Sequence, residues 1–470
     1  MERIDQCIAR GLGIDEGRIT DGLQYQSITE WDSLGHVSLM AALESDLGIE
    51  IDDDLMLGLR TVADIRRFAR GSRPTPPQPP PAGRPTVHRG LEGVYFDRTT
   101  ITRSDATEGV LEHRGYDIHD LAESASYEEV AHLLVKGELP DRSGLEAFRE
   151  ELVSHREPPP RVLDLARSLA HAHPMEALRT CVSALGAFGP VREGGRDETF
   201  DEALRTGIAL VAQVPTLVAA HHAARTGRER GVPAPDTSHA ASFLTALQGR
   251  EPTPAEVRIM NQAFVLHADF GPNPAALAAR VSISCRAGMT AAITSAIAAF
   301  AGSRHGGAAE RALRLVDEVG TPQNAERYVR DLQKRKEPVM GFGHRIFRTE
   351  DPRARHFRAI VQELSQEKGD THGLEVLDAV VAAMRPYRRH GVAPNVDLYS
   401  GLAYRLMGLP DDLAAALFVI GRTAGWVAQC LEQHSHNVLI VPLLEYVGPA
   451  PRTYRRPEPG RWNRRLPPRR

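Results

Sequence analysis

Seven prolines within sixteen residues divide this chain into two unequal parts. They lie in the segment 71–86, which reads GSRPTPPQPPPAGRPT. Proline has a fixed φ and no backbone N–H, so this stretch can join neither a helix nor a sheet ladder. It predicts a semi-rigid polyproline II linker over residues 71–88, about 50 Å long at about 3.1 Å per residue. We therefore expect one small domain at 1–70 and a larger body after the linker.

Composition excludes several classes of protein. The chain has 470 residues, of which 42% are hydrophobic and 25% charged, a balance typical of soluble globular proteins. The net charge of −4 argues against a nucleic-acid-binding protein. The four cysteines form no C-x-x-C pair, so neither a disulfide framework nor a metal site is expected. The most apolar stretch, 287–301, is too short to span a bilayer, and the N-terminus lacks an apolar signal core. We expect a cytoplasmic protein that binds no metal, membrane or nucleic acid.

The front domain contains a serine at the predicted start of an amphipathic helix. Asp32 can cap a helix that begins at Ser33, and Gly48 can end it in a left-handed conformation. Apolar residues recur between them at helical spacing: Leu34, Val37, Met40, Leu43 and Leu47. A further helix is expected near 62–68. These elements predict a small bundle of three or four helices.

The two ends of the chain carry opposite charge. Residues 1–70 have a net charge of −7, whereas residues 451–470 form a basic tail with eight arginines. Such runs are usually solvated, and we interpret both in this way. The opposite signs also permit a weak, salt-sensitive docking of the front domain on the tail.

The body after the linker is predicted to be mostly helical. The segments 94–101 and 109–114 can pair as a short hairpin. After them, apolar residues recur at helical spacing between caps and breakers. The clearest helices are expected at 126–136, 254–267, 290–301 and 411–433.

Several imidazole and charged groups stand out in the second half of this body. His305 and His344 are both next to glycines, which let the backbone approach a ligand closely. Asp397 lies two residues after an asparagine, and Arg422 lies between two glycines, at 421 and 425. One such histidine is usually structural, but two histidines with a carboxylate and arginines indicate a site that binds anions and moves protons.

The front domain resembles the acyl carrier protein family. The resemblance rests on D-S-L at 32–34, on the apolar helix that follows it, and on L-G-I-E-I at 47–51. The resemblance implies that a phosphopantetheinyl transferase attaches 4′-phosphopantetheine to Ser33, and that the thiol of this arm holds an acyl thioester. Two other interpretations stay open: Ser33 is only a helix cap, or the front domain binds partners without being modified.

The body resembles the citrate synthase family from about residue 90 to residue 448. The most specific motifs are M-G-F-G-H-R-I-F at 340–347, D-P-R-A at 351–354 and P-N-V-D-L-Y-S-G at 394–401. The resemblance implies an all-α domain at 89–450 with a short N-terminal β-hairpin. Its large subdomain would span 89–305 and 403–450, and its small subdomain 306–402. It also implies a homodimer.

The resemblance further implies a Claisen-type condensation of an acyl thioester, such as acetyl-coenzyme A, with a 2-keto acid. Asp397 would be the general base, His305 would donate a hydrogen bond to the thioester oxygen, and His344 would polarise the ketone. The keto acid would be bound by His267, Arg353 and Arg422. Hydrolysis of the product thioester would make the reaction irreversible, and no metal is required.

The sequence departs from the family pattern at three positions. Phe270 replaces the second histidine of H-A-D-H, and Val441 replaces the last arginine of N-R-L-I-R-P, which in the family reaches across the dimer to a substrate carboxylate. Arg304 is a new cation beside His305. Losing a charge-assisted hydrogen bond to a carboxylate costs about 1.5–3 kcal/mol. We therefore predict that the condensation chemistry is retained and that the keto acid is not oxaloacetate.

Two alternatives remain at this point. The protein is an ordinary citrate or 2-methylcitrate synthase whose lost contacts are replaced elsewhere, or it is a non-catalytic scaffold linked to a carrier. The retention of His305, His344 and Asp397 argues against the scaffold. The carrier also raises the hypothesis that the acyl donor is tethered to Ser33 instead of free coenzyme A.

Overall fold

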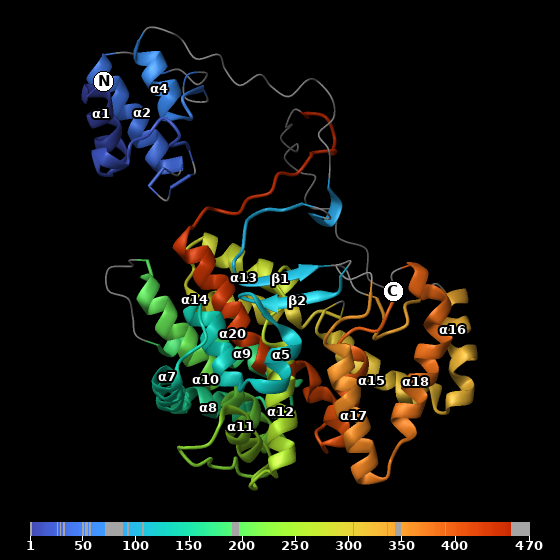
Figure 1. Cartoon of the computed structure of the whole chain (residues 1–470). Coiled ribbons are helices and arrows are strands. Elements are labelled where there is room, and N and C mark those ends of the chain that lie inside the picture. The colour runs from blue at the N-terminus through green and yellow to red at the C-terminus, as the bar shows by residue number, and fades with distance from the viewer. Residues whose placement is uncertain are drawn as a thin grey trace, which may run out of the picture.

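The computed structural model describes a front bundle and a much larger helical body (Figure 1). The described residues are 2–25, 27–28, 30–31, 33–48, 51, 55, 58–70, 88–91, 94–105, 108–189, 197–303, 305–335, 337–343, 349–390 and 392–452. The linker, apart from residue 88, and nearly all of the basic tail lie outside them. The two parts have separate hydrophobic cores that share no residue.

The front bundle follows the predicted pattern. Its helices are α1 (Glu2–Leu12), η1 (Glu16–Arg18), α2 (Ser33–Leu47) and α4 (Val62–Ala69). Gly48 has a φ of +65° directly after α2, as the left-handed end requires. The indole of Trp31 is fully buried and donates a hydrogen bond of 3.0 Å to Nδ1 of His36, which fixes the entry into α2. The expected cap, Asp32, lies outside the described residues.

A short antiparallel sheet opens the body, after η2 (Arg89–Leu91). Strand β1 (Thr102–Asp105) pairs with β2 (Val110–His113), which pairs with β3 (Tyr116–Asp117). The hairpin was predicted correctly in kind, but its first strand was placed too early, at 94–101. The apolar residues of that segment are largely exposed, with Tyr95 at 97%. They are therefore not the buried face of a strand.

Two groups of helices make up the rest of the body. Figure 1 shows α15–α18 on one side and α5–α14 with α20 on the other. The first group of helices, in chain order, is α5 (Ile118–Ser124), α6 (Tyr127–Lys136), α7 (Arg142–His155), α8 (Pro160–Ser168), α9 (Pro174–Phe188), α10 (Phe200–Arg225), α11 (His239–Gln248), α12 (Pro254–His267), α13 (Pro274–Ser284) and α14 (Met289–Phe300). The second is α15 (Gly307–Val319), η4 (Pro322–Asn324), α16 (Ala325–Lys334), α17 (Ala354–Lys368), α18 (His372–Met384), η5 (Arg385–His390) and α19 (Asp397–Leu406), followed by η6 (Asp411–Leu413) and α20 (Ala414–Ser435).

Helix α20 is the central element of the body. It packs against α6, α10, α12, α13 and α14, and nearly all of its residues are buried. Both α10 and the 411–435 segment are long and apolar enough to cross a membrane, but 72% and 100% of their apolar windows are buried inside the protein. Their hydrophobicity is thus explained by their place in the core. Helices α15 and α17 pack on α19 within the second group, and α15 and α19 also contact α20, which joins the two groups.

Candidate active site

Three buried cationic or imidazole side chains meet where α12, α17 and α20 come together. They are His267, Arg353 and Arg422, with exposed fractions of 0%, 3% and 2%. Each has one buried nitrogen with no hydrogen-bond partner among the described residues: Nδ1 of His267 and one terminal guanidinium nitrogen on each arginine. Unsatisfied buried nitrogens are costly and rare in native proteins. Three of them together indicate a receptor for an anionic ligand.

His267 is the last residue of α12 and is held on three sides. Its ring stacks on Phe357 and Phe418, with centroids 5.1 and 3.9 Å away. Its Nε2 lies 2.8 Å from the hydroxyl of Tyr404. Burial, with the nearby charges of Arg353 and Arg422, lowers the pKa of His267 well below its ordinary value. The ring is therefore neutral and carries one proton to donate.

Arg422 reaches His267 from α20, because two glycines let the chains approach closely. Its Nε donates to the backbone oxygen of His267 at 2.6 Å. A Cβ at Gly421 would lie 2.7 Å from the backbone oxygen of Phe264, and one at Gly425 would lie 2.2 Å from that of Ala268. Only glycine fits at such distances. Burial lowers the pKa of Arg422 to about 10, and the charge of Asp269 is the largest opposing effect.

Arg353 is paired with a carboxylate and stacked on an aromatic ring. Two of its guanidinium nitrogens donate to the two oxygens of Asp351, at 3.0 and 2.8 Å. Its guanidinium carbon lies 4.6 Å from the ring centroid of Phe270, within cation–π range. The substituted position Phe270 is therefore part of this site. Asp351 belongs to the D-P-R-A motif, but no feature of the sequence indicates that it is the partner of Arg353.

Asp397 begins α19, and its carboxylate makes no hydrogen bond with the described residues. Its backbone N–H donates to the side chain of Asn395 at 3.0 Å, which fixes the turn into the helix. Burial raises the pKa of Asp397 to about 7, although Arg353 and Arg422 oppose the shift. A carboxylate with a pKa near neutrality is suited to general-base catalysis. The backbone N–H of the preceding residue, Val396, donates to Oδ2 of Asp351 at 3.3 Å, which places Asp397 beside the Asp351–Arg353 pair.

His305 lies in the turn between α14 and α15. Its ring contacts Phe300 edge-on, with centroids 4.8 Å apart. Its Nε2 lies 3.4 Å from Oδ1 of Asn273, which is a long and weak contact. Burial, with the charge of Arg422, lowers the pKa of His305 to about 4. At neutral pH the ring is thus an uncharged imidazole that can donate to another acceptor.

The remaining sequence-predicted positions are His344, Arg304, Ser33 and Val441. His344 and Arg304 lie outside the described residues, as does the side chain of Ser33. Val441 lies in the irregular segment after α20 and is 66% exposed, away from the buried donors. Of the predicted residues, the structure brings together His267, Phe270, Arg353, Asp397 and Arg422, with His305 beside them.

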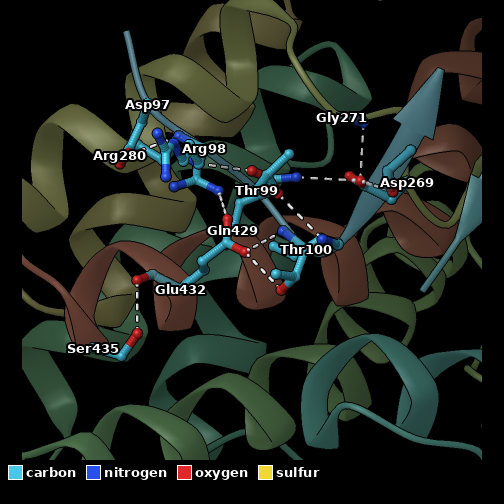
Figure 2. Close-up of polar contacts among 12 residues, drawn as sticks. Asp97, Arg98, Thr99, Thr100, Asp269, Gly271, Arg280, Gln429, Glu432 and Ser435 are labelled. Carbon is cyan, nitrogen blue, oxygen red and sulfur yellow. Dashed lines mark hydrogen bonds and ion pairs between the residues drawn. The ribbon is translucent and has the colours of Figure 1, made fainter. Parts of the chain in front are cut away.

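Sequence reasoning missed a polar network behind this site (Figure 2). Oδ2 of Asp269 accepts hydrogen bonds from Thr102 (2.6 Å), from the backbone of Gly271 (2.9 Å) and from Gln429 (3.2 Å). Gln429 accepts in turn from Arg280, which is paired with Glu432. The only signal in the sequence was the aspartate of the H-A-D motif.

The comparisons with known proteins agree with this geometry. The family model "Citrate synthase, C-terminal domain" matches residues 90–443, and "Phosphopantetheine attachment site" matches residues 2–69. The chain belongs to the citrate synthase family. It carries a phosphopantetheine-attachment domain at its front, so the expected combination of the two is confirmed.

Relatives of known function and structure cover the whole body. Citrate synthase 2 of Bacillus subtilis is 38% identical over 77% of this chain and 96% of its own length. The 2-methylcitrate synthase of Mycobacterium tuberculosis is 35% identical over 78% and 91%. The citrate synthase of Thermoplasma acidophilum, solved with carboxymethyl coenzyme A and oxaloacetate, is 31% identical with a TM-score of 0.75, over 79% and 98%. The mostly helical fold and an acyl-transferring condensation activity follow for this citrate synthase family member.

Proposed function

We propose that this protein condenses an acyl thioester with a 2-keto acid that carries one carboxylate and an apolar group. The observation that carries this proposal is the set of unsatisfied nitrogens on His267, Arg353 and Arg422 beside the ring of Phe270. The nitrogens suit the carboxylate and keto oxygens of such an acid. The phenyl ring suits its apolar end and cannot donate a hydrogen bond to a second carboxylate.

The proposed reaction begins with proton abstraction. Asp397 takes a proton from the carbon next to the thioester carbonyl, and His305 donates a hydrogen bond to the enolate oxygen that develops. The α-carbon of this enolate attacks the keto carbon, and His344 supplies a proton to the keto oxygen. Water then cleaves the thioester and releases the thiol. The raised pKa of Asp397 and the neutral ring of His305 support these two roles.

The charge balance of the site supports the choice of keto acid. Arg353 is already neutralised by the two oxygens of Asp351, and Arg422 has Asp269 as its main opposing charge. Val441 lacks the cation that the family supplies at this position. Among the described residues, Arg422 forms no direct ion pair with Asp269 and keeps one unpartnered nitrogen, so it can bind one carboxylate of a ligand. A second carboxylate would enter the buried site without a partner, which is unfavourable.

Turnover with a panel of keto acids tests the proposal directly. Acetyl-coenzyme A is offered with oxaloacetate, pyruvate and phenylpyruvate, and the free thiol is measured. We expect higher kcat/KM for an acid with an apolar end than for oxaloacetate. Full activity with oxaloacetate alone would instead identify an ordinary citrate synthase, and no activity with any acid would support a scaffold.

We further propose that the acyl donor is carried on Ser33. The match to a phosphopantetheine attachment site over residues 2–69 supports modification of this serine by a phosphopantetheinyl transferase. The proline linker gives the arm reach. The test is to load the modified full chain with acetyl, add keto acid, and follow the mass on Ser33. Loss of the acetyl group at a rate above that of Asp397→Asn supports a tethered donor, whereas Ser33→Ala should retain only turnover of the coenzyme A thioester.

We also propose that two copies of the chain associate. The segment after α20 carries a row of exposed apolar side chains: Val438, Leu439, Val441, Leu443, Leu444, Tyr446 and Val447. Several of these residues are up to 95% exposed, and covering them with a second subunit would stabilise the assembly. This arrangement agrees with the homodimer expected from the family.

A further inference from the structure

The polar network around Asp269 takes no direct part in the reaction steps described above, although it lies directly behind the keto-acid site. Asp269 is fully buried, and the residues that hold it come from three different elements: Thr102 on β1, Gln429 on α20, and the backbone of Gly271. Figure 2 shows Asp269 bonded to Gly271 at one end of the network, with Arg280 and Glu432 toward the other. Such a site is costly to build, because each buried polar group must find its partner.

One consequence of this network concerns the position of Phe270. The hydrogen bond from the Gly271 N–H to Asp269 closes a tight turn around Phe270. Gly271 has a φ of +79°, a conformation that favours glycine. The ring emerging from this turn lies under the guanidinium of Arg353. The carboxylate of Asp269 thus fixes the residue that replaces the family's second substrate histidine.

A second consequence concerns Arg422. The carboxylate of Asp269 is the main opposing charge for this buried guanidinium, although the two form no direct ion pair. Its Oδ1 has no hydrogen-bond partner among the described residues. A Cβ at Gly425, one turn after Arg422, would lie 2.6 Å from that oxygen. The charge is therefore close to α20 but leaves the free nitrogen of Arg422 available to a ligand.

Thr102 is the residue on which the network depends most. Its hydroxyl makes the shortest contact to Asp269, at 2.6 Å, and lies 3.1 Å from Nδ1 of His113, its partner across the hairpin. Burial lowers the pKa of His113 to about 4, so the ring is neutral. It can donate from Nδ1 to the threonine oxygen, while the threonine donates to the carboxylate. The β-hairpin is thereby bonded to the loop that carries Phe270.

We infer that Thr102 and Gln429, acting through Asp269, are positioning residues that set the affinity and selectivity for the keto acid. They touch no substrate. They hold the carboxylate of Asp269, which orients Phe270 and balances the charge of Arg422. Phe270 is proposed to contact the apolar end of the keto acid, and Arg422 to bind its carboxylate. The inference rests on the proposed function, because it requires a keto acid in this site.

The test compares two neighbouring threonines in the full-length chain. Thr102→Val keeps the shape of the side chain and removes its hydroxyl. Thr100→Val makes the same change at the exposed end of the network, where the hydroxyl contacts Glu432. For Thr102→Val we expect KM and the calorimetric Kd for the keto acid to rise about 3- to 10-fold with little change in kcat, the effect of one lost hydrogen bond. Selectivity between phenylpyruvate and oxaloacetate should fall.

The conservative and control variants separate positioning from simple loss of structure. Thr102→Ser, which restores the hydroxyl, should recover the affinity, and Thr100→Val should behave as the wild type. If Thr102→Val does not fold, Gln429→Leu carries the same expectation. A folded Thr102→Val with wild-type KM and Kd overturns this inference alone. A wild-type chain that binds none of the keto acids overturns the proposed function, and this inference with it.

Discussion

At the scale of single residues, the site retains a half-buried carboxylate, Asp397, that is difficult to ionise. The pKa of Asp397 is raised mainly by burial and is only partly lowered by two arginines. A carboxylate in this state holds its proton more strongly than an exposed one, and it is therefore a better base once it is ionised. The neutral His305 would complement it, because a ring with a pKa of about 4 is a weaker base than Asp397 and would not take the proton from it.

The pH dependence of turnover follows from these two groups. In the proposed reaction, Asp397 must be ionised and His305 neutral. Because the pKa of Asp397 is raised to about 7, kcat/KM should rise with pH through about 7 and fall about tenfold for each unit below it. His305, with its pKa lowered to about 4, should add no second step above pH 5. Initial rates between pH 5 and 9 measure this, and a flat profile would contradict the role of Asp397.

Substitution of Phe270 tests the origin of selectivity. Phe270→His restores a hydrogen-bond donor beside Arg353, so we expect kcat/KM for oxaloacetate to rise about tenfold, as expected for one charge-assisted hydrogen bond. The value for phenylpyruvate should fall. Phe270→Leu is the control, since it keeps an apolar side chain and should not improve turnover of oxaloacetate. Equal ratios in both variants would place selectivity elsewhere.

At the scale of elements, the site depends on how closely α20 approaches the end of α12. Gly421 and Gly425 are four residues apart and therefore lie on one face of α20, on either side of Arg422. The backbone of 264–269 packs against this face. A helix with larger residues here would stand further away, and Arg422 would no longer reach the backbone oxygen of His267.

Gly425→Ala should therefore destabilise the protein, against the usual effect of this substitution. Alanine in a helix is normally favoured over glycine by about 1 kcal/mol. Here the methyl group would lie 2.2 Å from the backbone oxygen of Ala268. We expect a net loss of about 1–3 kcal/mol, as for overpacked cores. Denaturant unfolding measures it, with Gly144→Ala in α7 as the control because its methyl group would meet nothing closer than 3.2 Å. A stabilised Gly425→Ala would contradict the close approach.

The elements also show what sequence reasoning can and cannot reach. Helix α12 was predicted with its observed bounds, because Thr253 and Glu256 form a capping box and the apolar spacing is regular. Strand β1 was misplaced, because Thr-Arg-Ser-Asp does not alternate apolar and polar residues whereas the exposed 94–96 segment is apolar. The five converging site residues were found through family motifs. The partnership of Asp269 with Thr102 joins residues 167 positions apart, which no local pattern can reveal.

At the scale of the whole molecule, the exposed apolar segment after α20 predicts association. Replacing Leu443 and Leu444, both 95% exposed, with glutamate should produce monomers, because charge in a covered apolar surface is unfavourable. Sedimentation velocity on the full chain measures this. Val232→Glu is the control, since Val232 is an apolar residue of similar exposure, 83%, on another loop. A wild-type chain that sediments as a monomer would contradict the proposed dimer.

The separate cores of the two parts have a consequence for how the chain can change over time. Since no buried apolar residue in the described part of the chain belongs to both cores, the front bundle can be exchanged for another without repacking the catalytic body. A covalent linker would by itself raise the effective concentration of an acyl donor held on the front bundle. If the front bundle carries the acyl donor, as proposed, delivery needs no dedicated recognition surface, and a single gene fusion is enough to bring a new donor to this catalytic body.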